Sequence, residues 1–197
     1  KKSLVLPFRY LTAFEEIKKL DASREVREVM IALNKAVDIS INNVPIFNGD
    51  TLLVLDVSGS MEERHLGNKS PNVIGALFSA VLLKSNNCDF MTFDNHARFV
   101  NVNPMDSTIT IANSIPFNGG GTNFHSIFQT ATKKYDRIII LSDMQGWIGG
   151  YSPASTFNQY KSTTKSNPFI YSFDLKNYGS MQFPQDKVFC LAGFSEK

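Results

Sequence analysis

The stretch TLLVLDVSGSM, from Thr51 to Met61, is the central feature of the pattern of hydrophobic and polar positions. Five apolar or β-branched residues lead into Asp56, and a turn that contains Ser58 and Ser60 follows. A continuous apolar run that ends at a turn is typical of a central parallel strand, because such a strand is buried on both faces. The sequence therefore predicts a buried strand that ends at Asp56.

Strands and helices are predicted to alternate after this run. Further apolar runs predict strands at residues 89–93, 98–102, 137–141, 169–174 and 188–192. Apolar residues at helical spacing, with Pro71 at a helix start, predict helices at residues 71–86, 106–114, 123–135 and 155–165. The last of these is polar and is expected on the surface. This alternation favours an α/β fold with a doubly wound, mostly parallel sheet and helices on both faces.

The first part of the chain has a different, helical pattern. One helix is expected within RYLTAFEEIKKL, and a second from Ser23 to about Asn42. A set of apolar residues at helical spacing predicts one packed face on the second helix: Val26, Val29, Met30, Leu33, Ala36, Val37 and Ile41. Pro45 and Asn48-Gly49 then break the chain. We therefore divide it into a helical segment, residues 1–49, and an α/β domain, residues 50–197.

Composition narrows the class of protein only slightly. The net charge of +2, from 20 basic and 18 acidic residues, gives no overall signal for polyanion binding. Cys88 and Cys190 lie in apolar runs and are expected as buried thiols, with a disulfide only if their strands are neighbours. So few cysteines, with no apolar run long enough for a membrane span, indicate a cytoplasmic protein. The start at Lys1-Lys2 indicates a fragment of a longer chain.

Three loops carry side chains with small oxygen ligands, and each loop follows a predicted strand or precedes a predicted helix. Asp56, Ser58 and Ser60 follow the first strand, Thr122 follows three glycines, and Asp143 follows the apolar run RIIIL. Open α/β sheets bind ligands at the carboxyl ends of their strands, and hard oxygens suit a Mg²⁺-type cation, with Mn²⁺ and Ca²⁺ as alternatives. Two carboxylates and three hydroxyls would leave such a cation an open position for a partner's carboxylate.

This arrangement resembles a known motif. D-x-S-x-S, a distant Thr after a Gly-rich turn and a further Asp after a strand are, in this order, the metal-ion-dependent adhesion site of von Willebrand factor A domains. The resemblance implies a divalent cation held by Asp56, Ser58, Ser60, Thr122 and Asp143, and a non-enzymatic role in binding a protein or other ligand through an acidic group. Gly119 to Gly121 would let Thr122 move.

Two further stretches resemble one branch of this family. LPFRYLTAF with ALNKAVDISINNVPIFNGDTLLVLDVSGSM, and the ending VFCLAGFSE, are similar to the Ro autoantigen family, in which a ring of helical repeats (the TROVE module) precedes the A domain. The resemblance implies that residues 1–49 are the tail of that module. Small non-coding RNA would bind through the ring of the full-length protein, and no membrane is implied. The last helix of an A domain is expected to be cut or replaced, since the chain ends at Ser195-Glu196-Lys197.

Other functions remain open for the same residues. Direct RNA binding would use the basic residues of the first segment, Arg9, Lys18, Lys19, Arg24 and Arg27, although their spread over several helix faces favours a solvated surface. Metal-assisted phosphate chemistry is a third alternative, but no general base is positioned for it. GGGT lacks the ending of a P-loop, and Ser58 lies outside a G-x-S-x-G elbow.

Two residues near the predicted site have no assigned role at this point. His125 stands in the first turn of a predicted helix, close to Thr122, and is expected to be solvated or hydrogen-bonded locally. Trp147 follows Asp143 and is expected as a core or lid residue, with a contact to the ligand as the alternative.

Overall fold

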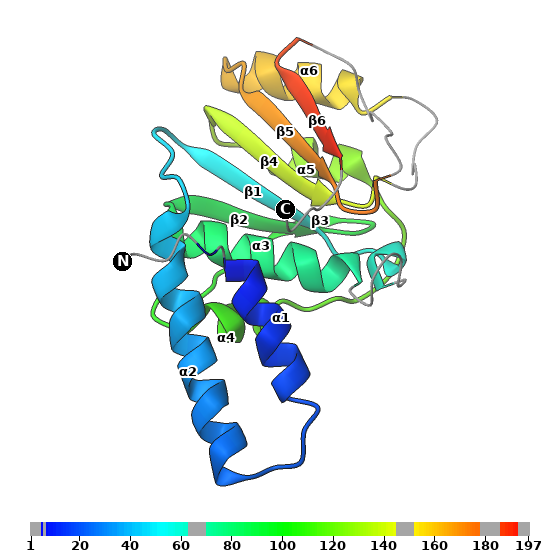
Figure 1. The fold of residues 1–197 in the computed structure, drawn as a ribbon. Coiled ribbons are helices and arrows are strands. Elements are labelled where there is room, and N and C mark those ends of the chain that lie inside the picture. Colours follow the sequence, from blue (N-terminus) through cyan, green and yellow to red (C-terminus); the bar gives the residue numbers. More distant parts are fainter. Residues whose placement is uncertain (1–4, 6, 63–69, 145–151, 178–185, 193–197) are drawn as a thin grey trace.

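Six strands form one sheet in the computed structural model, which describes residues 5, 7–62, 70–144, 152–177 and 186–192 (Figure 1). The strands are β1 Thr51–Asp56, β2 Cys88–Phe93, β3 Ala97–Phe99, β4 Arg137–Ser142, β5 Phe169–Asp174 and β6 Val188–Ala192. Their order in the sheet is β3-β2-β1-β4-β5-β6. All pairs are parallel except the β2-β3 hairpin, which is antiparallel. The predicted fold class is confirmed.

Strand β1 lies in the middle of the sheet, and every one of its residues is buried. Since side chains alternate along a strand, Leu52 and Val54 enter the core on one face while Leu53 and Leu55 enter the core on the other. This two-sided burial explains the absence of polar residues between Thr51 and Asp56. The predicted buried strand is confirmed.

Helices cover both faces of the sheet (Figure 1). Helices α3 (Pro71–Ser85) and α4 (Thr108–Ser114) lie on one face, and α5 (Phe124–Thr130) and α6 (Ala154–Thr164) lie on the other. The prediction that α6 is a surface helix was only half right, because Phe157 and Tyr160 are buried against Phe128 of α5. Two aromatic residues three positions apart suffice to anchor a helix whose other residues are polar.

Helices α1 (Pro7–Ile17) and α2 (Arg24–Ser40) form a hairpin that projects from the α/β domain (Figure 1). Ser23 caps α2 by accepting a hydrogen bond of 3.2 Å from the Val26 amide. The predicted packed face is only partly covered in the outer half of α2: Val37 is fully buried and Val26 and Met30 are half-buried, but Val29 is 43% exposed. The outer half extends beyond the domain and packs only on α1, so its apolar residues are not covered on all sides.

The inner half of the hairpin packs on the α/β domain through its own small core. Leu11 and Val37 are buried with Leu77 and Val81 of α3 and with Ile109 of α4. In addition, the Phe8 and Phe78 rings stack with their centroids 4.6 Å apart. The helical segment and the α/β domain therefore share a continuous apolar interface.

A polar joint reinforces this interface at Asp38 of α2. Its Oδ1 accepts hydrogen bonds from the amide of Thr108 (2.9 Å) and from the hydroxyl of Thr108 (2.6 Å), and lies 3.3 Å from the ammonium of Lys84. Partial burial alone would raise the pKa of Asp38, but the hydrogen bonds from Thr108 and the charge of Lys84 outweigh it and lower the pKa. The carboxylate thus holds the start of α4 and the end of α3 to the hairpin.

Replacing Asp38 by Ala is expected to lower the free energy of unfolding by about 1–3 kcal/mol at pH 7, because the Thr108 amide loses its cap and Lys84 loses its partner. Since the pKa of Asp38 is lowered, the difference from wild type should vanish as the pH falls below about 4 and the carboxylate protonates. Urea denaturation at several pH values measures this. The exposed Asp21 provides the control: Asp21→Ala should change stability by less than about 0.5 kcal/mol. If Asp38→Ala and Asp21→Ala lowered the free energy of unfolding equally, Asp38 would not hold the hairpin to the domain.

The two cysteines lie far apart in the sheet. Cys88 is on β2 and Cys190 on β6, with β1, β4 and β5 between them, and both are free thiols. A disulfide between them is excluded by this arrangement. Both are partly exposed, so the prediction of buried thiols was wrong, because each lies on or next to an outer strand of the sheet.

None of the helices in the described ranges combines the length and the apolar character needed to cross a bilayer.

Candidate metal centre

The two predicted aspartates lie at the carboxyl ends of adjacent parallel strands. Asp56 is the last residue of β1, and Asp143 directly follows β4. Both side chains are completely buried. Ser142, the last residue of β4, donates a hydrogen bond of 2.6 Å from its hydroxyl to Asp56 Oδ2 and ties the two strand ends together. The parallel pairing of β1 and β4 therefore creates the acidic part of the site.

The turn after β1 folds back over the end of its own strand. The Ser58 amide donates to Asp56 Oδ1 at 2.9 Å, and a short 3₁₀ helix, η2 (Gly59–Glu62), begins at the next residue. This tight path brings the hydroxyl oxygens of Ser58 and Ser60 to 3.3 Å from each other. Ser58 is buried and Ser60 is partly exposed. Three of the five predicted ligands thus belong to one local unit.

The Gly-rich loop that carries Thr122 touches this turn. The Gly59 amide donates to the Gly120 carbonyl at 3.1 Å. Gly119 and Gly120 have φ values of 73° and 100°, a region in which residues with a Cβ are strained. Thr122, only 5% exposed, is buried just beyond them. The glycines therefore allow the loop to turn sharply beside the DVSGS segment.

The turn of the β2-β3 hairpin supports the same loop from the other side. Asn95 accepts a hydrogen bond from the Gly121 amide through Oδ1 (3.1 Å), and its carbonyl accepts one from the Asn123 side-chain amide (3.0 Å). The Asp94 carbonyl accepts one from the Asn123 backbone amide (2.8 Å). Asp94 is itself fixed by Arg98, whose Nη2 lies 2.7 Å from Asp94 Oδ2. Thr122 is thus held between two hydrogen-bonded anchor points.

The carboxyl group of Asp56 is perturbed by its surroundings. Burial raises its pKa to about 6, hydrogen bonds from Ser142 and Ser58 oppose the rise, and the negative charge of Asp143 adds to it. Two buried carboxylates on neighbouring strands repel each other, so positive charge at this place is favourable.

The donor set fits a hard divalent cation. No group of three or more His, Cys, Asp or Glu side chains within the described residues is arranged to hold a metal ion. A cation at this edge would therefore depend on the hydroxyls of Ser58, Ser60 and Thr122 as well as on Asp56 and Asp143. Carboxylate and hydroxyl oxygens, without sulfur or imidazole, are the ligand chemistry of Mg²⁺ and its relatives.

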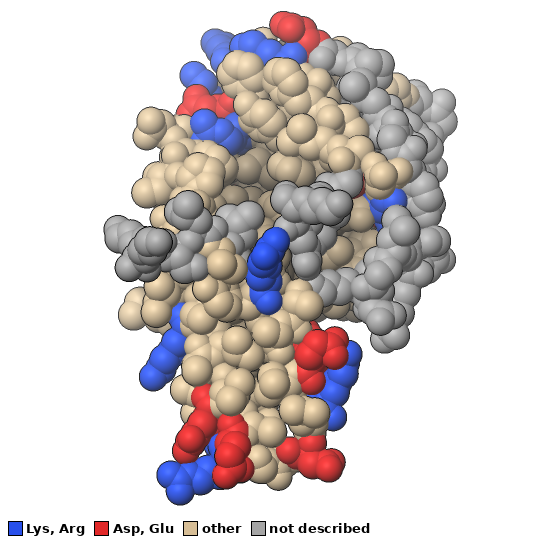
Figure 2. All heavy atoms as spheres, viewed as in Figure 1, with Lys and Arg blue, Asp and Glu red and all other residues tan. Residues whose placement is uncertain are grey.

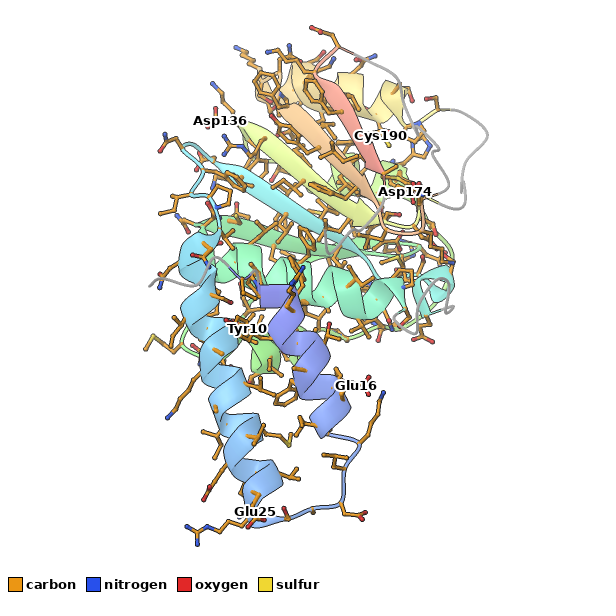
Figure 3. All side chains as sticks on the ribbon, in the orientation of Figure 1. Tyr10, Glu16, Glu25, Asp136, Asp174 and Cys190 are labelled. Carbon is orange, nitrogen blue, oxygen red and sulfur yellow. The ribbon has the colours of Figure 1, made fainter. Side chains whose placement is uncertain are left out.

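Three further residues of this edge were missed from the sequence. Ser142 donates to Asp56, Asp174 ends β5 as a fully buried carboxylate, and Lys176 places its ammonium 3.1 Å from Asp143 Oδ2. Figure 3 shows Asp174 at the same edge of the sheet. The sequence did hold a signal for Asp174 as a residue of this edge, since it follows an apolar run just as Asp56 and Asp143 do. Lys176 carried none, because a lysine after a strand normally reaches into solvent.

His125 does not belong to the set of oxygen ligands. It is buried at the start of α5, and its Nδ1 lies 2.9 Å from the hydroxyl of Thr156 in α6. The ring is hydrogen-bonded as expected, but to a residue of another helix rather than locally, and the alternative of a solvated ring is wrong because His125 is buried. Trp147 lies outside the described residues.

The five basic residues considered for RNA lie on the α1-α2 hairpin. Arg9, Lys18, Lys19, Arg24 and Arg27 are all exposed. Lys19 pairs with Glu16 at 2.7 Å, and Arg24 pairs with Glu28 at 2.9 Å. Figure 2 shows acidic and basic side chains intermixed at the outer end of the hairpin. Acidic neighbours weaken the attraction of these residues for a polyanion.

Comparison with known proteins bears on the family and the fold of this chain. The family model of the Ro60 vWA domain matches residues 50–172. The RNA-binding protein RO60 of Deinococcus radiodurans is 29% identical over 144 residues, which are 68% of this chain and 27% of that protein. The crystal structure of the Deinococcus radiodurans Ro (RSR) protein has a TM-score of 0.75 at 20% identity, and the match covers 96% of this chain and 41% of that one. The chain thus spans well under half of either relative.

Proposed function

Because the chain belongs to the family of Ro60 vWA domains, we propose that it is the metal-dependent interaction domain of a Ro-like RNA-binding protein. One observation carries the proposal. Asp56 and Asp143 are completely buried at adjacent strand ends, and the hydroxyls of Ser58 and Ser60 lie beside each other in the turn after Asp56. A pair of buried carboxylates is unfavourable unless positive charge compensates it.

Each residue has a distinct role in this proposal. Asp56 and Asp143 supply negative charge, while Ser58, Ser60 and Thr122 supply neutral oxygens. Ser142 orients Asp56 through its hydrogen bond of 2.6 Å. A divalent cation held by this set, Mg²⁺ in the first place, would retain positive charge with which to attract an acidic group of a partner. The partner is therefore a protein or other ligand that presents a carboxylate.

The whole protein's RNA binding is part of the proposal and is not assigned to these residues. The relative named as RNA-binding is almost four times as long as the matched region, since that region is 27% of it. We place RNA binding in the remainder of the full-length protein, and the protein in the cytoplasm. We assign no enzymatic reaction to this domain.

A Mn²⁺ titration followed by calorimetry tests the metal site. Wild type is expected to bind one equivalent of Mn²⁺. Asp56→Ala should lose more than about 100-fold in affinity, because loss of a residue that only hydrogen-bonds to a metal ligand already costs about 10–100-fold. Asp136 lies at the opposite edge of the sheet (Figure 3), and Asp136→Ala is the matched control that should bind as wild type does. Equal binding by the wild type and Asp56→Ala would end the proposal.

Two additional measurements address the partner. Acetate, the simplest carboxylate, should bind to the Mn²⁺-loaded domain and not to the domain in EDTA. A gel shift with single-stranded RNA across salt concentrations tests the alternative function. A steep salt dependence without a metal requirement would favour direct RNA binding by the hairpin.

A further inference from the structure

Lys176 is buried beside one of the candidate metal ligands. Its side chain is 1% exposed, and its Nζ lies 3.1 Å from Oδ2 of Asp143, whose side chain is fully buried. Among the lysines and arginines of the described residues, Lys176 is the one that is buried. A buried lysine is rare unless it is paired, because removal of an ammonium from water is unfavourable. The pair with Asp143 accounts for the burial.

The backbone fixes Lys176 at this position. Asp174 Oδ1 accepts hydrogen bonds from the amides of Lys176 (3.0 Å) and Asn177 (2.9 Å). The Leu175 amide donates to the carbonyl of Ser142, 2.9 Å away, at the end of the neighbouring strand β4. Asn177 has a φ of 62°, the left-handed conformation that Asn tolerates better than most residues. The turn after β5 is thus bound to the residue that precedes Asp143.

Three buried carboxylates lie along this edge of the sheet, at the ends of three neighbouring strands: Asp56, Asp143 and Asp174. An ammonium 3.1 Å from Asp143 compensates part of this charge without any metal. A divalent cation in contact with the same carboxylate would be repelled by the ammonium at close range. The ammonium of a lysine can move aside for such a cation, because its charge is concentrated at the end of a flexible side chain.

We propose that Lys176 is a tethered cation that occupies Asp143 in place of a divalent cation, so that metal binding has to displace its ammonium. This inference rests on the proposed metal site. Lys176 stabilises the metal-free domain and lowers the affinity for metal. Because the turn of residues 174–177 carries Lys176, occupation of the site by a cation is coupled to the conformation of this turn.

Lys176→Met tests the competition, because methionine has similar length and no charge. Titrated with Mn²⁺, the variant should bind about tenfold or more tightly than wild type, the size of effect that a neighbouring like charge has on a buried group. Lys187→Met removes the same charge at the opposite edge of the sheet, before β6, and should leave the affinity unchanged. Lys176→Gln, which retains a hydrogen-bond donor, serves as a second neutral variant and should also bind more tightly.

Thermal unfolding in EDTA provides a second readout. Lys176→Met should unfold at a lower temperature than wild type, and Mn²⁺ should raise its midpoint by more than it raises that of wild type. When Asp143 is replaced by Asn, proteins with Lys and with Met at position 176 should unfold at the same temperature. Neutral variants that bind Mn²⁺ no more tightly than wild type, with wild type binding normally, would overturn the role of Lys176 alone. If neither wild type nor the neutral variants bind Mn²⁺, the proposed metal function fails as well.

Discussion

Asp56→Asn is expected to raise the free energy of unfolding of the metal-free domain by about 3 kcal/mol at pH 7.5, although it removes a proposed metal ligand. Burial raises the pKa of Asp56 from 3.8 to about 6, so the ionised carboxylate is less favourable in the folded than in the unfolded chain by roughly that amount. Asparagine has the same shape and no charge. Its carbonyl can accept from the Ser58 amide, and its NH₂ group can donate to the Ser142 hydroxyl in place of Oδ2.

The pH dependence of this effect has a definite sign. A carboxyl group whose pKa is raised on folding binds more protons in the folded state, so wild-type stability decreases as the pH rises from about 4 to about 6. Below about pH 4 the group is protonated in both states, and wild type and Asp56→Asn should differ little. Above about pH 6 the difference should be constant. Urea denaturation in EDTA between pH 4 and pH 8 measures the whole curve.

Asp89 provides a control of opposite sign. A hydrogen bond of 2.6 Å from the Tyr135 hydroxyl, opposed by partial burial and assisted by Lys133, lowers the pKa of Asp89. Asp89→Asn should therefore be less stable than wild type at pH 7.5, and the loss should disappear at low pH. If Asp56→Asn were also less stable than wild type at pH 7.5, the carboxylate of Asp56 would be favourable in the metal-free domain, and the argument from buried charge would be wrong.

Phe124→Ala is expected to lower the free energy of unfolding by about 3–5 kcal/mol, because it leaves a cavity at the start of α5. The Phe124 ring is 2% exposed and lies 5.1 Å from the ring of Phe93, centroid to centroid. Phe124 comes two residues after Thr122, and Phe93 directly precedes Asp94, whose carbonyl accepts from the Asn123 amide. Loss of the ring should therefore also loosen the loop, which faster amide exchange at residues 121–123 would report.

The control for this substitution is a partly exposed phenylalanine of the sheet on which α5 packs. Phe169 of β5 is 42% exposed, and Phe169→Ala should reduce stability by less than about half as much, roughly 1–2 kcal/mol. Urea denaturation of both variants makes the comparison. Similar losses for the two would mean that the Phe93-Phe124 contact does not hold α5 to the sheet.

The sequence alone predicted all six strands and the positions of the proposed ligands, although β3 (Ala97–Phe99) is shorter than the predicted strand at 98–102. A strand interior buried on two faces has to be apolar, so Leu52–Leu55 of β1 and Ile138–Leu141 of β4 are visible as apolar runs, and the polar residues where they stop mark the edge of the sheet. The family motif then joined Asp56, Ser58, Ser60, Thr122 and Asp143 across the chain. The start of α2 was also determined locally, because a serine cap depends on residues within one turn.

The tertiary structure decided which side chains meet and which surfaces are covered. Phe157 and Tyr160 make α6 a core helix, and Val29 stays exposed, because periodicity predicts a face but not what packs on it. Ser142 reaches Asp56 only through the pairing of β1 with β4. Lys176 reaches Asp143 only because the turn after β5 is tied to β4. A buried charge is stabilised by a partner that is distant in sequence, and the local pattern of residues holds no record of that partner.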